Sequence, residues 1–453
     1  MSAKKRYVQV GLGGRSHMFS EAVVEDFAEY SELVGLCDRN EGRLKLLMDW
    51  AKEHGVSPRG YIAPDFDKMI EECKPDCVIV TTIDAYHDEY ACRALELGCD
   101  VITEKPMTIS AEKCQRMIDT QRKTGKKLTV TFNYRYMPPC TQVKDLLMSG
   151  VIGDIISVDY NYLLNTDHGA SYFNRWHAYR KNSGTLLVHK ATHHFDLAHW
   201  WLSAAPVSVS GIGGRQFYTA KTAARYGLGN RAERCKDCPV STKCPFFCDI
   251  ARGYDKRLYL DNEQYDGYIR DRCVFNDEID IYDTMQLVIG YDTGVKMTYS
   301  LNAFLPWEGL TINFNGTKGR LEFSEGEWFD VRKDASGGDQ SAGILGHVMA
   351  TEPRIRICPH FKQPYLAEVT HGEGSHGGGD RVMLRDLFHP NPPADKHLRK
   401  ADQRSGAYSI LTGVAGDLSI STGKPVRIDE LVKDIGYPDY PPMPSADEPL
   451  AYR

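Results

Sequence analysis

A glycine-rich turn near the start of the chain has the spacing of a phosphate-binding loop. Residues 11–16, Gly-Leu-Gly-Gly-Arg-Ser, follow a short apolar run and open a stretch of helical period, so backbone N–H groups at a helix start can approach a pyrophosphate. Asp38 ends the second apolar run, about 20 residues further on, where a carboxylate accepts from the ribose of an adenosine. Asp38 favours NAD, while Arg39 could pair with a 2′-phosphate and leaves NADP open. The expected cofactor contacts are Gly11, Gly13, Gly14, Arg15, Ser16, Asp38 and Arg39.

Two further polar groups follow apolar runs and are expected to border the nicotinamide. Glu104-Lys105-Pro106 follows the run that ends at Thr103, and Asn133-Tyr134-Arg135 follows the run that ends at Phe132. Open parallel sheets bind their ligands at the carboxyl ends of the strands. On spacing alone, Lys105 could instead be a solvated surface lysine paired with Glu104.

A histidine-rich segment at 184–196 carries groups that could act as acids and bases. On a helix, His189, His193 and Asp196 stand at i, i+4 and i+7 and share one face. An imidazole titrates close to neutral pH, which suits a general base. The alternatives are a polar helix end packed under tryptophans 200 and 201, or a histidine-bound metal ion, which Lys190 would repel.

Taken in order, these motifs resemble the Gfo/Idh/MocA oxidoreductases over nearly the whole chain. The Glu-Lys-Pro triplet is the most specific match. The resemblance implies reversible hydride transfer between a sugar-type hydroxyl and nicotinamide, with Lys105 contacting both the nicotinamide ribose and the substrate. The family pattern Asp-x-x-x-His-x-x-Asp has His193 and Asp196 here, but His189 stands in place of its first aspartate. The remaining cofactor contacts implied are Thr81, Thr82, His87, Glu104, Lys105, Asn133 and Arg135.

The resemblance also implies roles for individual side chains. His193 takes the hydroxyl proton, the Lys105 ammonium stabilises the developing alkoxide, and Lys190 is a further acid–base candidate. Because His189 cannot orient His193 as a carboxylate would, either Asp196 does so or Lys190 joins the proton relay. The expected substrate contacts are Lys105, Arg135, Arg175, Trp176, His177, His189, His193 and His376.

Three functions are weighed on this basis. The first is an NAD-dependent oxidoreductase acting on a secondary hydroxyl of a sugar, glycoside or cyclitol. The second is a redox-neutral NAD-dependent glycosidase, which oxidises C3 transiently and eliminates the aglycone. A His-Gly-Gly stretch like that at 376–378 occurs in the family's NAD-dependent glycosidases, and Lys190, His189 or His376 would be its extra base. The third is an NAD-binding regulator without catalysis.

The elements that must position these groups fall into two patterns. Up to residue 135, short buried runs alternate with helical stretches, which predicts a doubly wound parallel Rossmann sheet. From 136 to 453, longer alternating runs predict an α+β domain with a large, mostly antiparallel open sheet. We expect this second domain to bind the carbohydrate and to form a homodimer or homotetramer through its sheet. The expected strands are 7–10, 33–37, 77–82, 101–103, 128–132, 155–163, 207–212, 284–291, 294–304, 310–315 and 320–323.

Five cysteines gather in or near a polar insertion at about 228–275. Cys235, Cys238 and Cys244 are spaced as ligands of a structural zinc ion, and either Cys248 or Cys273 would complete the set. An iron–sulfur cluster or free thiols stay open as alternatives.

Composition sets the wider limits. The chain has 453 residues, 42% of them hydrophobic, and a formal net charge of −6, which excludes a disordered chain. The absence of a basic run argues against nucleic acid, and no stretch approaches the roughly 20 apolar residues of a membrane span. The 13 cysteines are an odd number and mostly scattered, which suits a reducing compartment. We therefore expect a cytoplasmic protein with a small-molecule ligand.

Overall fold

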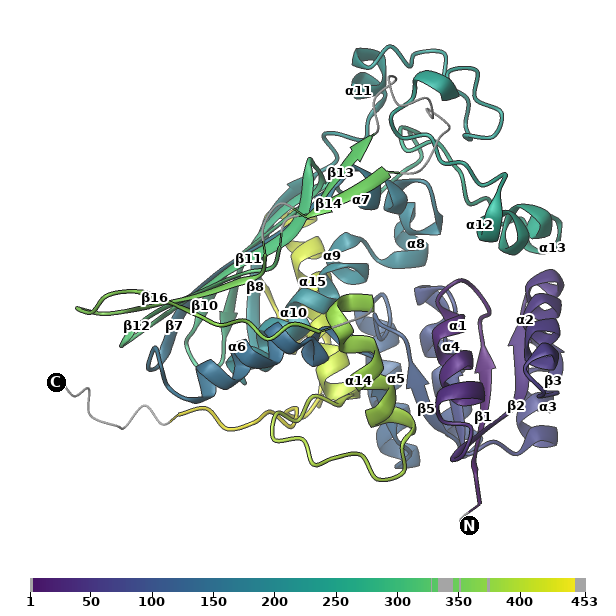
Figure 1. The fold of residues 1–453 in the computed structure, drawn as a ribbon, viewed down its shortest axis with the longest axis horizontal. Coiled ribbons are helices and arrows are strands. Elements are labelled where there is room, and N and C mark those ends of the chain that lie inside the picture. The colour runs from purple at the N-terminus through teal and green to yellow at the C-terminus, as the bar shows by residue number, and fades with distance from the viewer. Residues whose placement is uncertain (1–2, 327, 333–344, 350–351, 373–374, 445–453) are drawn as a thin grey trace.

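A seven-stranded sheet forms the N-terminal part of the molecule (Figure 1). The computed structural model describes residues 3–326, 328–332, 345–349, 352–372 and 375–444. The strands lie in the order β17-β6-β5-β4-β1-β2-β3, and all neighbours are parallel except β17 (Ala401–Asp402), which runs antiparallel to β6. The parallel strands are β1 (Lys5–Val10), β2 (Ser31–Asp38), β3 (Arg59–Ile62), β4 (Cys77–Val80), β5 (Asp100–Thr103) and β6 (Leu128–Val130).

Helices connect these strands and cover both faces of the sheet, so the predicted doubly wound Rossmann fold is confirmed. The first connection begins as α1 and continues as a π-helix (Ala22–Asp26). Strand β3 is absent from the predicted set, because only Tyr61 of its four residues is buried and an apolar run is missing. The helices are α1 (Ser16–Glu21), α2 (Glu41–Glu53), α3 (Phe66–Cys73), α4 (His87–Glu96) and α5 (Ala111–Thr124).

The second sheet is larger and mostly antiparallel, as predicted. Among the described residues its strands follow the order β16-β15-β12-β11-β7-β10-β9-β8-β18, while β13 pairs with β11 and β14 pairs with β13. Only β7 and β10 pair in parallel within this described sheet. The strands are β7 (Ile155–Asn165), β8 (Pro206–Gly214), β9 (Thr284–Tyr291), β10 (Lys296–Leu305), β11 (Trp307–Gly316), β12 (Gly319–Ser324), β13 (Trp328–Arg332), β14 (Leu345–Met349), β15 (Arg354–Pro359), β16 (Tyr365–Ala367) and β18 (Val426–Arg427).

The histidine-rich segment packs against one face of the large sheet together with helix α15 (Gln403–Thr422). It forms two helices, α9 (Leu186–His189) and α10 (Ala191–Leu202), which are separated at Lys190. Helix α15 lies so close to α9 that a Cβ on Gly413 would stand 2.2 Å from the Leu187 carbonyl oxygen. This approach fixes the position of His189 at the end of α9.

Shorter helices complete the molecule. The insertion carries α11, α12 and α13, and Figure 1 shows α12 and α13 next to α2 of the nucleotide-binding sheet. No helix in the described part of the chain is long and apolar enough to cross a membrane. The helices are α6 (Pro138–Met148), α7 (Thr166–Phe173), α8 (Arg180–Ser183), α11 (Ala220–Arg225), α12 (Gly253–Leu258), α13 (Glu263–Asp266), α14 (Gly379–Phe388) and α16 (Ile428–Leu431).

Candidate active site

The glycine-rich loop is built to approach another chain segment closely. Gly11 has φ +85°, and a Cβ there would lie 2.5 Å from the backbone nitrogen of Thr82. The Thr81 hydroxyl donates to the Gly11 carbonyl at 2.6 Å, and the Ser16 hydroxyl donates to the Gly13 carbonyl at 2.6 Å. Helix α1 begins at Ser16, so the loop offers N–H groups at a positive helix end. These residues fit the pyrophosphate of a dinucleotide.

At the end of β2, Asp38 is buried and accepts hydrogen bonds from the protein. Its oxygens accept from the Leu12 and Asn40 N–H groups and from the Arg43 guanidinium. Arg39 is exposed, with its guanidinium 6.0 Å from the ring centre of Tyr86. Asp38, which is predicted to bind the ribose, thus lies at the end of β2 and contacts a buried arginine that spacing did not indicate.

Arg15, Glu104 and Asn133 form a network next to the loop. Arg15 Nε donates to Glu104 Oε1 at 2.8 Å, and Glu104 Oε2 accepts from the Lys105 N–H at 3.0 Å. Asp380 on α14 lies 3.6 Å from the Arg15 guanidinium and accepts from Asn133 Nδ2 at 2.7 Å. These predicted cofactor residues are brought together, and their mutual contacts hold the turn that carries Lys105.

His87 holds the other side of the same turn. Its Nδ1 lies 2.8 Å from the Pro106 carbonyl and its Nε2 lies 3.1 Å from the Thr82 carbonyl. Burial lowers the pKa of His87. With both ring nitrogens facing backbone oxygens, His87 positions Lys105 and Thr82.

Lys105 lies beside a histidine–carboxylate pair. Its Nζ donates to the His189 carbonyl at 3.4 Å, and His189 Nδ1 lies 2.5 Å from Asp84 Oδ2. Asp84 follows β4, so the pair joins the nucleotide-binding sheet to the end of α9. Burial raises the pKa of Asp84, which Lys105 opposes, and burial also lowers the pKa values of Lys105 and His189. A neutral imidazole oriented by a carboxylate can accept a proton.

Aromatic side chains surround His189. The His177 ring meets it edge-on with 4.2 Å between centroids, and Trp176 stacks on His177 at 3.6 Å. Tyr172 also meets His189 edge-on, and Arg175 lies over the Tyr172 ring. The predicted substrate contacts Arg175, Trp176 and His177 thus lie around one imidazole, and flat apolar faces of this kind suit the faces of sugar rings.

Lys190 belongs to a second group of buried titratable side chains. Its ammonium lies 3.4 Å from the Tyr134 hydroxyl and 4.7 Å from the ring centre of Tyr162. Burial lowers the pKa of Lys190 to about 8, while Glu308 acts in the opposite direction. Burial raises the pKa of Glu325 to about 7. Lys190 can therefore exchange a proton near neutral pH.

The structure separates histidines that the sequence placed on one helix face. The helix is interrupted at Lys190, so His189 faces Asp84, whereas the His193 ring stacks on Tyr134 with 4.4 Å between centroids. The prediction that these histidines share one helix face is therefore wrong, because it assumed a single continuous helix.

Arg135 and Asp196 also depart from their predicted roles. They form a two-pronged ion pair at 2.6 and 2.8 Å, with each side chain 1% exposed. Asp196 therefore does not orient His193, and Arg135 is committed to this buried pair. His376 lies in the short helix η9 (Ser375–Gly378), and its side chain is outside the described part of the structure.

Some residues of the site were not found by sequence reasoning. Asp84 lies just beyond β4, the kind of position that drew attention to Lys105, so the same rule could have found it. Glu308 is a further example, and its two carboxylate oxygens lie 2.8 and 2.9 Å from Nδ1 of His168, a residue whose place before Arg175 in the sequence does indicate the substrate cleft. Glu308 and Glu325 lie in or next to strands of the large sheet, far away in sequence, and no local pattern marks them.

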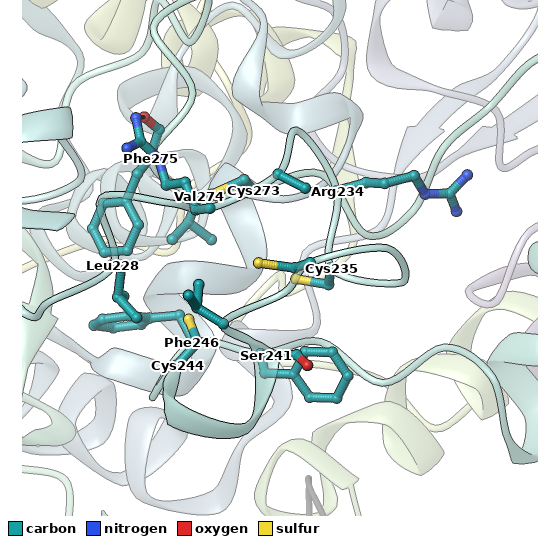
Figure 2. Close-up of a pocket in the computed structure, with 14 residues that line it drawn as sticks. Leu228, Arg234, Cys235, Ser241, Cys244, Phe246, Cys273, Val274 and Phe275 are labelled. Atoms are coloured by element: carbon teal, nitrogen blue, oxygen red, sulfur yellow. Dashed lines mark hydrogen bonds between the residues drawn. The ribbon is translucent and has the colours of Figure 1, made fainter. Parts of the chain in front are cut away.

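Four of the five clustered cysteines line one small pocket of the insertion (Figure 2). They are Cys235, Cys238, Cys244 and Cys273, whereas the Cys248 N–H donates to the Cys235 thiol from outside this lining. Over the described residues, however, no three or more His, Cys, Asp or Glu side chains are grouped to hold a metal ion. The arrangement of the described residues therefore does not support the predicted zinc site.

Two family descriptions together match most of the chain. "Oxidoreductase family, NAD-binding Rossmann fold" matches residues 5–132, and "Oxidoreductase family, C-terminal alpha/beta domain" matches residues 144–428. The chain belongs to the Gfo/Idh/MocA oxidoreductase family. The resemblance carried by the motifs is therefore confirmed, and the protein is an NAD-binding family oxidoreductase.

Relatives in this family differ in how much of the chain they match. YteT of Bacillus subtilis is 34% identical over 436 residues, which cover 94% of this chain and 98% of YteT. Glycosyl hydrolase family 109 protein 2 of Akkermansia muciniphila is 31% identical over 163 residues, 35% of this chain and 34% of that protein. D-glucoside 3-dehydrogenase of Escherichia coli is 35% identical over 124 residues, 27% of this chain and 34% of that protein.

Proposed function

We propose that this protein is an NAD-dependent dehydrogenase acting on a secondary hydroxyl of a sugar, glycoside or cyclitol. The observation that carries the proposal is the His189–Asp84 pair beside Lys105, at the strand ends that follow the glycine loop. When bound, NAD supplies nicotinamide C4 as the hydride acceptor. The partial match to D-glucoside 3-dehydrogenase supports a sugar substrate.

In this proposal, His189 replaces His193 as the base. If Nδ1 donates to Asp84, Nε2 keeps a lone pair for the proton of the substrate hydroxyl. The Lys105 ammonium then stabilises negative charge on the same oxygen. Comparing His189→Gln with His193→Gln tests this assignment. The His189 variant should lose more of kcat, and the opposite order would return the role to His193.

A redox-neutral glycosidase is the second candidate, because Lys190 is a separate buried group that can act as a base. Oxidation at C3 would acidify the C2 proton, which Lys190 would remove as the aglycone leaves. Water would then add across the resulting double bond, and the hydride would return to C3. The partial match to a family 109 glycosyl hydrolase supports this alternative.

One assay separates the two functions. The purified protein and NAD⁺ are incubated with free sugars and aryl glycosides, and NADH absorbance and aglycone release are followed in the same sample. NADH that accumulates without aglycone release supports the dehydrogenase. Aglycone release that requires NAD⁺ but accumulates no NADH supports the glycosidase. Failure to bind either dinucleotide would contradict both.

We also propose a homo-oligomer formed through the large sheet. Ile156, Ile212 and Val288 are exposed apolar side chains on β7, β8 and β9, and exposed apolar residues on an open sheet favour association. Light scattering should therefore give a dimer or tetramer. A monomer at micromolar concentration would contradict this.

We also propose a cellular location and a structural metal ion for this protein. The 13 cysteines are all free, which supports a reducing, cytoplasmic location. A structural zinc ion bound by Cys235, Cys238 and Cys244, with Cys273 as the fourth ligand of the same pocket, would require the thiols to move together.

A further inference from the structure

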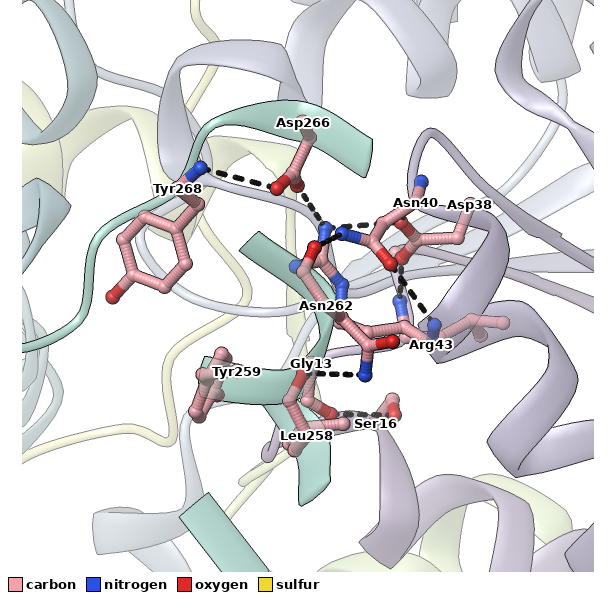
Figure 3. Close-up of polar contacts among 12 residues, drawn as sticks. Gly13, Ser16, Asp38, Asn40, Arg43, Leu258, Tyr259, Asn262, Asp266 and Tyr268 are labelled. Carbon is pink, nitrogen blue, oxygen red and sulfur yellow. Dashed lines mark hydrogen bonds and ion pairs between the residues drawn. The ribbon is translucent and has the colours of Figure 1, made fainter. Parts of the chain in front are cut away.

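The insertion that carries the cysteines also reaches the nucleotide-binding domain. Its residues 253–268, which include α12, η7 (Leu260–Asn262) and α13, pack against the glycine loop and the end of β2 (Figure 3). No local pattern in the sequence indicates a contact of this kind. Its contacts fall at both ends of the expected adenosine diphosphate position.

At the glycine loop, the Tyr259 hydroxyl accepts a hydrogen bond from a backbone N–H group. The Gly14 N–H donates to the Tyr259 hydroxyl at 3.1 Å, and a Cβ on Gly14 would lie 3.3 Å from that oxygen. N–H groups at this position are the donors that bind phosphate oxygens. The hydroxyl of Tyr259 therefore lies where an acceptor of the cofactor would be expected.

At the ribose end, Arg43 lies between two carboxylates from different domains. Its Nη2 lies 3.1 Å from Asp38 Oδ1 and 2.5 Å from Asp266 Oδ2. The Arg43, Asp38 and Asp266 side chains are 9%, 4% and 5% exposed. The Tyr268 N–H donates to the other oxygen of Asp266 at 3.2 Å. Asp266 is thus fixed toward Arg43.

Further contacts hold the insertion in this place. Asn40 Nδ2 donates to the Asn262 carbonyl at 2.9 Å. A Cβ on Gly42 would stand 1.8 Å from Asn262 Oδ1, so a larger residue there would displace the insertion. The segment therefore meets the nucleotide domain at close-packed contacts.

The charges of this cluster disfavour a phosphate. Although burial acts to lower the pKa of Arg43, the two carboxylates outweigh it and the pKa is raised. Arg43 therefore stays cationic and, with Asp38 and Asp266, makes a buried group of net charge −1. A 2′-phosphate brings about −1.5 to −2 further charges at neutral pH, and buried like charges repel strongly.

We propose that residues 253–268 form the outer wall of the adenosine half of the dinucleotide site, and that Asp266 selects NAD over NADP by holding Arg43 between two carboxylates. The inference rests on the proposed function, since it requires that the chain bind a dinucleotide. It adds a specificity-determining residue from outside the Rossmann domain.

Binding measurements on the full-length protein test the role of Asp266. Titration calorimetry gives Kd for NAD⁺ and NADP⁺ with the wild type, Asp266→Asn and Asp261→Asn. Asp261 is the matched control, because it belongs to the same insertion but forms an exposed pair with Lys256. The preference for NAD⁺ should fall by about tenfold or more in Asp266→Asn, since a freed arginine can bind phosphate. It should be unchanged in Asp261→Asn.

The outcomes distinguish this inference from the proposed function. A wild type that binds neither dinucleotide contradicts the proposed function itself. If the wild type binds NAD⁺ and the NAD⁺-over-NADP⁺ preference of Asp266→Asn is within twofold of the wild-type preference, the proposed role of Asp266 is overturned. The double variant Arg43→Gln/Asp266→Asn should lose the gain in NADP⁺ affinity that Asp266→Asn shows. If the double variant keeps this gain, the proposed role of Asp266 is also overturned.

A measurement on the wild type tests the wall without any variant. NAD⁺ should slow backbone hydrogen exchange in residues 253–268 as well as in the glycine loop at 11–16. Slower exchange in the loop alone would show that the insertion is not part of the site.

Discussion

Replacing Asp84 by asparagine tests the proposed base most directly. Asp84 is 3% exposed and His189 is 8% exposed, and their side chains are 2.5 Å apart. A hydrogen bond to a charged group contributes about 1.5–3 kcal/mol. If the carboxylate stabilises the imidazolium formed in the transition state, its loss lowers kcat by about 10- to 150-fold at about 1.4 kcal/mol per tenfold. The KM for NAD⁺ should change little.

The assay is NADH formation with the sugar found in the substrate panel, with kcat and KM measured separately across pH. Asp88→Asn is the matched control, because Asp88 is a buried carboxylate of α4 that pairs with Lys113 and Arg116 and does not contact His189. The reasoning is refuted if Asp84→Asn is folded, binds NAD⁺ and keeps kcat within twofold of the wild type.

Three further predictions follow from buried or clustered groups. Burial lowers the pKa of His199 to about 3, so the unfolded chain takes up a proton below about pH 6.5 while the folded chain does not, and stability is lost as pH falls. His199→Gln should therefore reduce the loss of unfolding free energy between pH 7 and 5 by about 2 kcal/mol in denaturant titrations, whereas the exposed His360→Gln should leave that loss unchanged. Burial lowers the pKa of Lys190 to about 8, so the pH profile of activity should show an ionisation near pH 8. If Lys190→Arg still shows this ionisation, it belongs to another group. Metal analysis of the purified protein tests the zinc proposal. About one zinc ion per chain, with much less in Cys235→Ser, would support it, whereas folded, metal-free wild type would exclude it.

The fold followed from the sequence because burial leaves a strong pattern. All four residues of β4 are buried, and short apolar runs of this kind between helical stretches indicate a parallel sheet covered on both faces. Strands β17 and β18 have two residues each, which is too short to form any periodicity. The pattern therefore revealed most of the long strands, but it missed β15, which has six residues, as well as the short strands at the sheet edges.

The site was predictable only where its residues follow strands of the first sheet. Lys105 was found by that rule, and Asp84 obeys it as well. The ion-pair partner of Arg135 was not predictable, because two residues far apart in the sequence leave no local spacing pattern that marks them as a pair. The interruption at Lys190 was missed because residues 186–202 have helical character on both sides of it. The contact between Asp266 and Arg43 depends on how an insertion folds back, which no local pattern records.

The short strand β17 has a consequence for synthesis of the chain. Ala401 and Asp402 complete the edge of the first sheet beside β6, and the Asp402 side chain then caps α15. A nascent chain folds from its N-terminus as it leaves the ribosome. The first sheet therefore keeps an open edge at β6 until nearly 90% of the protein has been made, and an open edge can pair with another chain. The sheet whose strands are synthesised first is thus closed only after most strands of the second sheet have been made, and its protection from aggregation depends on residues that follow α14.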